Sequence, residues 1–458
     1  VPFTYVMRPV VSIAFLVAVY CSSITGGGIT AILFKIPGTP SSAPTTFDGY
    51  PLAAKGQAGK ALGVGIFFSF IGTLLGLAVL MFIAPSLASV ALKFSYYEYF
   101  AVGVFSISMM ASLISGSVVK GLVSGAIGLA FAMVGAAPID GIPRLTFGFH
   151  ALDAGFDILP VLIGLFAISE IIKAAKEKGK PQGKVLQDFK IKGFGFSFAE
   201  FKSQIVNLFR SAAIGIGIGI LPGIGGGTSN ILAYTAAKNQ SKTPEKFGTG
   251  IIDGIVASET ANNASIGGAL VPLMTLGIPG DTVTAMLLGG LMIHGLNPGP
   301  LLFQNNGPLV YGIFAACLIA NVFMLLMEYL GIKVFARVLT VPKHILLPII
   351  MVLCVVGAFG VNNRLFDVWA VLFFGIVAYL LEKGGFPLPP IILGFILGPT
   401  IETNLRRGLM QSEGSIAPFF THPISLAFLI ITMIVIVLAV RKELRARRSN
   451  RVEKEGKS

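Results

Sequence analysis

The stretch SETANNASIGGALVPLMTLGIPGDTVTAMLLGG (residues 258–290) decides the fold, because it is apolar enough for a membrane yet Gly, Pro, Asn and Thr interrupt it. A weaker copy, SSITGGGITAILFKIPGTPSSAPTTFDG, occupies residues 22–49, and its Pro37-Gly38 corresponds to Pro279-Gly280 of the other. In each copy the proline lies eleven residues after a glycine. A duplicated apolar segment broken by glycine and proline is typical of the binding site of a secondary transporter.

The composition indicates a membrane protein with many spans. Of the 458 residues, 54% are hydrophobic and only 12% are charged, whereas a soluble domain carries about 25% charged residues. The net charge is +13, but the lysines and arginines gather in loops and at the C-terminus, as membrane topology requires. A nucleic-acid-binding arm is therefore the weaker interpretation, and three cysteines in apolar runs indicate neither a disulfide nor a metal site.

The apolar runs predict an all-α polytopic membrane protein with about 10–12 membrane segments. We expect two pseudo-symmetric and inverted repeats with broken helices or re-entrant hairpins. The chain then divides into a first transmembrane repeat (1–172), a lysine-rich linker (173–202), a second transmembrane repeat (203–440) and a basic tail (441–458). Because cytoplasmic loops are rich in Lys and Arg, we expect the linker and the tail in the cytoplasm.

Two further expectations follow from the glycines and prolines. We expect Gly26-Gly27-Gly28 to interrupt the first apolar span, which runs from Val10 to Leu33. The spacing between the copies places the partner of Pro222 upstream of Val1. We therefore expect the first repeat to be N-terminally truncated here, with a Pro-Gly-rich turn in a preceding extension.

Three short motifs predict helix starts inside the membrane. Thr39-Pro40 combines an N-cap residue with a proline at the first helical position. Asp281 or Thr282 is expected to cap the corresponding helix of the second copy, and Gly223–Gly227 to open a third helix. A helix N-terminus presents free N–H groups and about half a positive charge. It can therefore bind an anion without a cationic side chain.

The substrate site is expected where these helix starts meet. No Lys or Arg occurs between Lys246 and Lys333, so backbone N–H groups are the expected ligands of a carboxylate. The residues expected to bind substrate are Gly38, Thr39, Ser41, Thr45, Thr46, Gly225, Thr228, Ser229, Asn262, Asn263, Pro279, Gly280 and Thr282. Two alternatives stay open: the Gly-Pro sites are ordinary kinks between packed helices, and the asparagines and threonines are hydrogen-bonding links between helices.

Three residues are candidates for holding a coupling cation, namely Glu259, Asp281 and Asn263. Ionisable residues inside a membrane are functional candidates by default, and broken helices free carbonyl groups that can hold a cation. Asp281 also has a plain role as an N-cap. No cofactor is expected apart from Na⁺ or H⁺ as the coupling ion, and the sequence contains no motif for nucleotide hydrolysis or zinc binding.

The sequence resembles the large membrane subunit of the tripartite tricarboxylate transporters, the TctA family, in two long stretches. They are GGGITAILFKIPGTPSSAPTTFDGYPLAAKGQAGKALG (residues 26–63) and ETANNASIGGALVPLMTLGIPGDTVTAMLLGGLMIHGLNPGP (residues 259–300). The resemblance extends from about Val1 to Val440 and includes Leu397-Gly398-Pro399. It implies a bacterial inner-membrane permease for citrate-like di- or tricarboxylates, driven by a Na⁺ or H⁺ gradient. It also implies a small membrane subunit and a periplasmic solute-binding protein as partners.

The expected function is thus a cation-coupled, binding-protein-dependent importer of small organic anions, and not an enzyme. A channel-like pathway for organic anions and a non-transporting membrane scaffold remain the alternatives. An intramembrane enzyme would need a polar catalytic constellation, and the sequence offers none.

Overall fold

The computed structural model describes residues 2–113, 117–176, 194–338 and 343–455. Among these residues, eight helices are long and apolar enough to cross a membrane, and two shorter apolar helices cover Val118–Ala132 and Thr282–Ile293. The predicted all-α polytopic membrane protein is confirmed. Five of the lysines expected in the central linker lie between residues 177 and 193, outside the described residues.

The chain forms two compact units, and each unit draws on both halves of the sequence. The first contains Val1–Ala91 and Lys176–Ile349, and the second contains Leu92–Ala175 and Ile350–Ser458. These units group the elements by packing and say nothing of internal symmetry. The two inverted repeats therefore stay a prediction.

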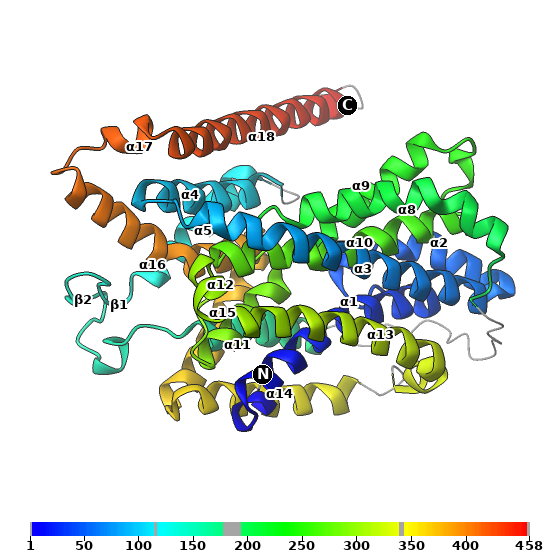
Figure 1. Ribbon diagram of the computed structural model, residues 1–458, viewed down its shortest axis with the longest axis horizontal. Coiled ribbons are helices and arrows are strands. Elements are labelled where there is room, and N and C mark those ends of the chain that lie inside the picture. The colour runs from blue at the N-terminus through cyan, green and yellow to red at the C-terminus, as the bar shows by residue number, and fades with distance from the viewer. Residues whose placement is uncertain (1, 114–116, 177–193, 339–342, 456–458) are drawn as a thin grey trace. The chain divides into compact units, whose positions relative to one another are not determined.

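All the secondary-structure elements in the described residues of the first unit are helices (Figure 1). Its elements are η1 (Pro2–Val6), α1 (Pro9–Phe34), η2 (Pro40–Ser42), α2 (Thr45–Leu52), η3 (Ala53–Gln57), α3 (Ala58–Ala91), α8 (Phe198–Gly219), α9 (Gly225–Gln240), η6 (Pro244–Lys246), α10 (Ile252–Leu276), α11 (Thr282–Ile293), α12 (Pro300–Asn305) and α13 (Gly307–Val338). A further helix, α14 (Lys343–Asn362), begins in this unit and ends in the second.

Helix α10 forms the centre of the first unit, where it packs between α3 and α8 and also contacts α9 (Figure 1). Every residue from Gly254 to Thr275 is buried. Glycines make this close packing possible: a Cβ on Gly72 would lie 2.5 Å from the Thr260 carbonyl oxygen, and one on Gly215 would lie 2.4 Å from that of Ala261. Small residues let helix backbones approach closely inside a membrane, so α10 is held on two sides by glycine-lined helices.

Both copies of the repeated segment end a helix at the same position. Helix α1 ends before Lys35, which has left-handed backbone angles (φ 57°), and α10 ends before Gly277, which has them too (φ 71°). The chain then folds back: a Cβ on Gly38 would lie 2.8 Å from the Cα of Gly27. The Pro-Gly motifs therefore break the helices as predicted. The interruption expected at Gly26-Gly27-Gly28 is wrong, because α1 runs through these glycines without a break.

The helix starts after the two breaks use the same hydrogen bonds. The Thr39 N–H donates to Ser42 Oγ at 3.2 Å, and Ser42 Oγ donates to the Thr39 carbonyl at 2.9 Å. The Asp281 N–H donates to Thr284 Oγ1 at 2.8 Å, and this hydroxyl donates to the Asp281 carbonyl at 2.9 Å. The duplication seen in the sequence thus extends to the backbone geometry of the two hairpins.

The second unit contains one small β-hairpin among helices. Its elements are α4 (Tyr96–Leu113), α5 (Val118–Ala132), β1 (Gly135–Ala136), β2 (Pro143–Arg144), η4 (His150–Leu152), α6 (Ile158–Leu162), η5 (Ile163–Ile168), α7 (Ser169–Lys176), α15 (Leu365–Lys383), α16 (Leu388–Gln411), α17 (Ala417–Thr421) and α18 (Pro423–Glu455). Helix α16 packs against α4 and α5, and α18 packs against α4.

Ion pairs attach the loop that carries this hairpin to α16. Arg144 makes a two-pronged contact with Glu402, at 2.6 and 2.9 Å, and Arg406 binds both Glu402 and Asp140. The Arg406 guanidinium holds the pKa of Asp140 below its usual value. Within this loop β1 and β2 pair antiparallel, with Gly135 opposite Arg144.

The contact of α10 with α3 gives a first test. A Cβ on Gly267 would lie 2.0 Å from the Gly76 carbonyl oxygen, whereas one on Gly217 would meet no atom within 4 Å. We expect Gly267→Ala to destabilise the protein by about 1–3 kcal/mol, because the two helices must move apart. Gly217→Ala, the matched control in α8, should stabilise it by about 0.5–1 kcal/mol. Thermal unfolding of the purified protein in detergent measures both, and equal melting temperatures would contradict this packing.

Candidate functional site

Three helix starts meet beside α10, where the chain enters η2, α9 and α11. The Gly223 N–H donates to the Pro279 carbonyl at 3.2 Å, which ties the start of α9 to the break before α11. Gly225 lies directly against Asp281, because a Cβ on this glycine would be 2.4 Å from the aspartate Cβ. Gly225 also has positive φ (58°), a conformation that glycine adopts without strain.

The first turn of α9 also touches the first copy of the repeat. A Cβ on Gly226 would lie 2.6 Å from Asn262 Oδ1, 3.1 Å from Ser265 Oγ and 3.2 Å from the Cβ of Ser41. The Asn230 side chain, one turn further along α9, donates to the Ser41 carbonyl. We call this meeting point of Ser41, Gly226 and Asn262 the junction.

Asn262 has unused hydrogen-bonding capacity at the junction. Its side chain is fully buried, and neither Oδ1 nor Nδ2 has a hydrogen-bond partner in the described part of the chain. Asn230 Oδ1 is likewise buried and unpaired there. Leaving a buried polar group without a partner costs about 1–3 kcal/mol. The junction therefore offers donors and acceptors to a ligand, beside helix N-termini that favour negative charge.

Of the two residues expected to cap α11, Asp281 and Thr282, the structure uses Asp281. Its Oδ1 accepts from the Thr284 N–H at 2.6 Å, and its Oδ2 accepts from the Tyr20 hydroxyl at 2.7 Å. The carboxylate is thus engaged with α11 and α1 at once. This arrangement favours the cap among the roles considered for Asp281.

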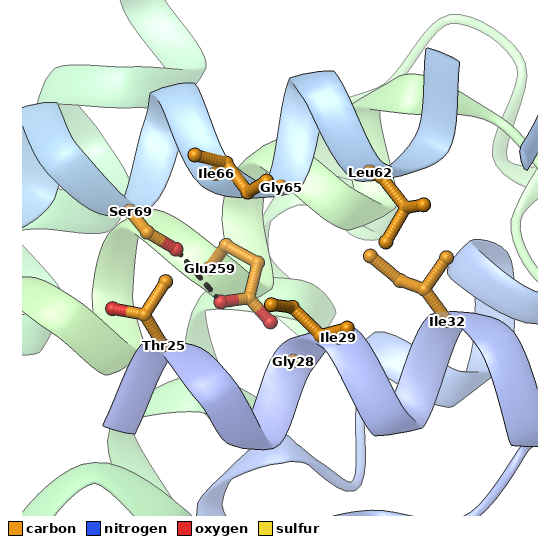
Figure 2. Close-up of a pocket in the computed structure, with 9 residues that line it drawn as sticks. All are labelled: Thr25, Gly28, Ile29, Ile32, Leu62, Gly65, Ile66, Ser69 and Glu259. Carbon is orange, nitrogen blue, oxygen red and sulfur yellow. Dashed lines mark hydrogen bonds between the residues drawn. The ribbon is translucent and has the colours of Figure 1, made fainter. Parts of the chain in front are cut away.

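Glu259 lies in a separate cluster, one turn before Asn262 on α10. Figure 2 shows its carboxyl group beside Ser69. Its carboxyl group is 1% exposed and accepts from Thr45 at 2.5 Å and from Ser69 at 2.9 Å. Asn263 donates to the same carboxyl group at 3.3 Å. Within the described ranges no lysine or arginine makes a salt bridge to it. A buried carboxylate without a counter-charge costs several kcal/mol, and a bound cation or a proton would remove that cost.

A small cavity adjoins the Glu259 carboxyl group (Figure 2). Its volume is about 10 Å³, close to the ~10–15 Å³ that one water molecule requires. Figure 2 shows Thr25 and Ser69 on one side of the carboxyl group and the apolar Leu62 and Ile32 beyond the other. Gly28 leaves room for the carboxyl group, because a Cβ there would lie 2.7 Å from Glu259 Oε1.

Asn263 connects the Glu259 cluster to α1 and α3. Its Nδ2 also donates to Ser69 Oγ at 2.8 Å, and its Oδ1 accepts from Thr25 Oγ1 at 2.7 Å. Thr25 Oγ1 lies 2.9 Å from the sulfur of Met324 on α13. Four elements, α1, α3, α10 and α13, thus share one chain of polar contacts.

Gly38 and Thr39 line a larger pocket on another face of α1. The pocket has a volume of about 630 Å³, within the range of roughly 300–1,000 Å³ common for small-molecule sites. Its described lining residues are Ser22, Ser23, Gly26, Gly27, Ile29, Thr30, Gly38, Thr39, Met324, Met327 and Glu328. Two predicted substrate-binding residues therefore face open space, and the Thr39 hydroxyl also lies 3.0 Å from that of Ser41 at the junction.

Four further residues that were expected to bind substrate lie at the starts of helices. Thr46 donates to the Ala43 carbonyl at 2.6 Å and Ser229 to that of Gly226 at 3.0 Å, so both hydroxyls serve their own helix starts. Thr228 and Thr282 are half-buried in the first turns of α9 and α11. Among the described residues, no group of three or more His, Cys, Asp or Glu side chains could hold a metal ion.

The comparisons with known proteins assign the chain to a family. A sequence model described as "Tripartite tricarboxylate transporter TctA family" matches residues 1–393. The chain belongs to the TctA family. It is therefore a member of a transporter family and a multi-pass membrane protein. As a tripartite system, the TctA family implies a small membrane subunit and a periplasmic binding protein as partners.

Two relatives of this TctA chain come from Agrobacterium vitis. One, described as an uncharacterized 52.8 kDa protein in the TAR-I ttuC' 3'region, is 35% identical over 98% of this chain and 88% of its own length. The other, an uncharacterized protein in the TAR-II ttuC' 3'region, is 36% identical over 50% of this chain and 96% of its own length. No solved structure matches the chain.

Several residues around Glu259, around Asp281 and in the larger pocket of this TctA chain were not predicted from the sequence. Thr25 and Ser69 are single hydroxyls inside apolar spans, and such residues give no signal until their helices are placed. Tyr20 likewise lies in an apolar span, and the sequence gives no sign of its contact with Asp281. Glu328 could have been found, because it is an acid inside the apolar stretch from Leu309 to Leu330 and an ionisable residue inside the membrane is a candidate by default.

The two adjacent asparagines of the TctA chain allow a matched test. The Asn263 side chain makes several hydrogen bonds, and the Asn262 side chain makes none within the described residues. We expect Asn263→Ala to destabilise the protein by about 2 kcal/mol, because Thr25 and Ser69 lose partners, and Asn262→Ala to change stability by less than about 1 kcal/mol. Thermal unfolding in detergent compares the two variants. A larger loss for Asn262→Ala would show that its side chain is bonded in the native protein.

Proposed function

We propose that this TctA chain is the large permease subunit of a tripartite, binding-protein-dependent secondary transporter that imports citrate-like di- or tricarboxylates with a cation gradient. The observation that carries the proposal is the junction, where three helix starts meet beside the unpaired amide of Asn262. Helix N-termini bind carboxylates through backbone N–H groups. The absence of Lys and Arg between Lys246 and Lys333 leaves this device as the source of positive charge in that part of the sequence.

The Glu259 cluster supports the coupling to a cation. It combines a buried carboxyl group with the hydroxyl oxygens of Thr45 and Ser69, and a water-sized cavity adjoins the carboxyl group and Ser69. Oxygen ligands of this kind suit hard cations, and a proton on the carboxyl group would remove the same buried charge. Either Na⁺ or H⁺ is therefore compatible with the site as the coupling ion, with no other cofactor.

The family supplies the remaining parts of the proposal. A tripartite transporter receives its substrate from a periplasmic solute-binding protein, so this chain belongs in the bacterial inner membrane beside its small membrane subunit. The Lys-rich stretch of residues 173–202 and the basic tail of residues 441–458 then face the cytoplasm, in keeping with the excess of positive charge in cytoplasmic loops.

Uptake in a reconstituted system tests the function. The chain, its small membrane subunit and the binding protein are assembled in proteoliposomes, and a panel of labelled di- and tricarboxylates is offered under an imposed Na⁺ or H⁺ gradient. We expect accumulation above the outside concentration that ends when the gradient is collapsed. Uptake that only equilibrates would favour a channel-like pathway, and no uptake of any carboxylate would refute the proposal.

Glu259→Gln tests the role of the Glu259 cluster in coupling. The substitution keeps the size of the side chain and removes the charge, so the protein should assemble normally. We expect gradient-driven accumulation to fall by at least about tenfold, the range of a coupling free energy of 1–3 kcal/mol. Glu245→Gln is the control, because this glutamate lies exposed in η6. Accumulation by Glu259→Gln at the wild-type level would exclude this carboxyl group from coupling.

A further inference from the structure

The larger pocket poses an electrostatic problem for an anion transporter. Gly38 and Thr39, two residues expected to bind substrate, lie in its wall together with hydroxyl groups that include Ser22 and Ser23. Of its described lining residues only Glu328 carries a charge, and that charge is negative. A di- or tricarboxylate in this pocket would be repelled by an ionised Glu328, since like charges in a poorly solvated site interact strongly.

Glu328 presents an unpaired carboxyl oxygen at the pocket. Its side chain is 6% exposed, and its Oε2 is buried without a hydrogen-bond partner in the described residues. The residue lies on α13, one turn after Met324, and both line the pocket. Isolated buried carboxylates are so costly that they bind a proton or another cation. The unpaired oxygen and the open pocket together indicate a place for one positive charge.

Glu328 is also linked to the Glu259 cluster across α1. Gly27 faces Thr39 in the pocket wall, and Gly28, the next residue, faces the Glu259 carboxyl group. Around the same helix, Met324 contacts Thr25, which donates to Asn263 beside Glu259. The two carboxyl groups therefore lie on different faces of α1 and are joined by this chain of contacts. A positive charge bound at one of them therefore changes the free energy of binding at the other.

We propose that Glu328 is a second cation-binding carboxylate, which admits the anionic substrate to the pocket only when a Na⁺ ion or a proton neutralises it. The inference rests on the proposed function and adds to it the residue that makes substrate binding conditional. Because coupling between two ligands is reciprocal, the bound carboxylate also retains the cation. An ionised and unoccupied Glu328 excludes the substrate, so the substrate does not cross without the cation.

The variant Glu328→Gln in the complete tripartite complex tests this proposal. Carboxylate uptake into proteoliposomes is measured over a series of Na⁺ concentrations at fixed pH, and then over a series of pH values at fixed Na⁺. For the wild type, we expect the KM of the carboxylate to rise at least about tenfold as the coupling cation is depleted. For Glu328→Gln we expect a KM that stays constant within about twofold, retained exchange of labelled for unlabelled substrate, and loss of accumulation. The series that shows the effect identifies the ion.

Two outcomes of this experiment would overturn the proposal. One is a wild-type dependence of KM on the cation in Glu328→Gln. The other is loss of exchange together with accumulation in a correctly assembled variant, which would make Glu328 a general requirement for transport rather than a condition on binding. Glu245→Gln, an exposed acid in the same unit, is the control and should keep wild-type behaviour.

A measurement on the wild-type complex covers the case in which the variant does not assemble. A hydrophobic carbodiimide modifies carboxyl groups in apolar surroundings, and mass spectrometry locates the modified residue. We expect labelling of Glu328 that Na⁺ or citrate alone slows little and that both together slow at least about tenfold. Labelling of Glu328 that is insensitive to every combination would overturn the inference. Failure of the wild type to take up any carboxylate would instead refute the proposed function.

Discussion

The packing of α10 against the glycines of α3 and α8 is the constraint on which the rest of the first unit depends. This helix carries Ser, Glu, Thr and two Asn in six consecutive residues, and it is not among the helices apolar enough to span a membrane alone. It is stable inside the unit because its neighbours supply close backbone contact and hydroxyl partners such as Ser69. The tight fit fixes the rotation of α10, which directs Glu259 toward α1 and Asn262 toward the helix starts.

Helix α1 alone separates the larger pocket from the Glu259 cluster. The glycines of this helix have two uses there: Gly27 admits Thr39 and Gly38 on the pocket side, and Gly28 admits the Glu259 carboxyl group on the other. A residue with a side chain at either position would displace one of these groups. The same few residues thus position the expected substrate contacts and the expected cation contacts, which is the arrangement that coupling between the two requires.

The sequence predicts where the helices end better than it predicts which side chains meet between them. Proline and glycine act locally, so the ends of α1 and α10, the cap at Asp281 and the start of α9 are all confirmed. The sequence wrongly predicts an interruption at the glycines of α1, because a glycine that bends a helix and one that admits a neighbour look alike in sequence. The partners of Glu259 depend on the rotation of three helices, so Thr25 and Ser69 could not be predicted.

The two matching hairpins differ in one respect that bears on how the molecule moves. Both place a left-handed residue at the end of the helix, but the first has Lys35 there and the second has Gly277. A side chain in this conformation carries a strain of about 1 kcal/mol that glycine avoids. The first hairpin is also exposed from Lys35 to Gly38, whereas Pro279 and Gly280 are buried. Local unfolding should therefore start at the first hairpin, beside the pocket, while the second hairpin keeps its structure.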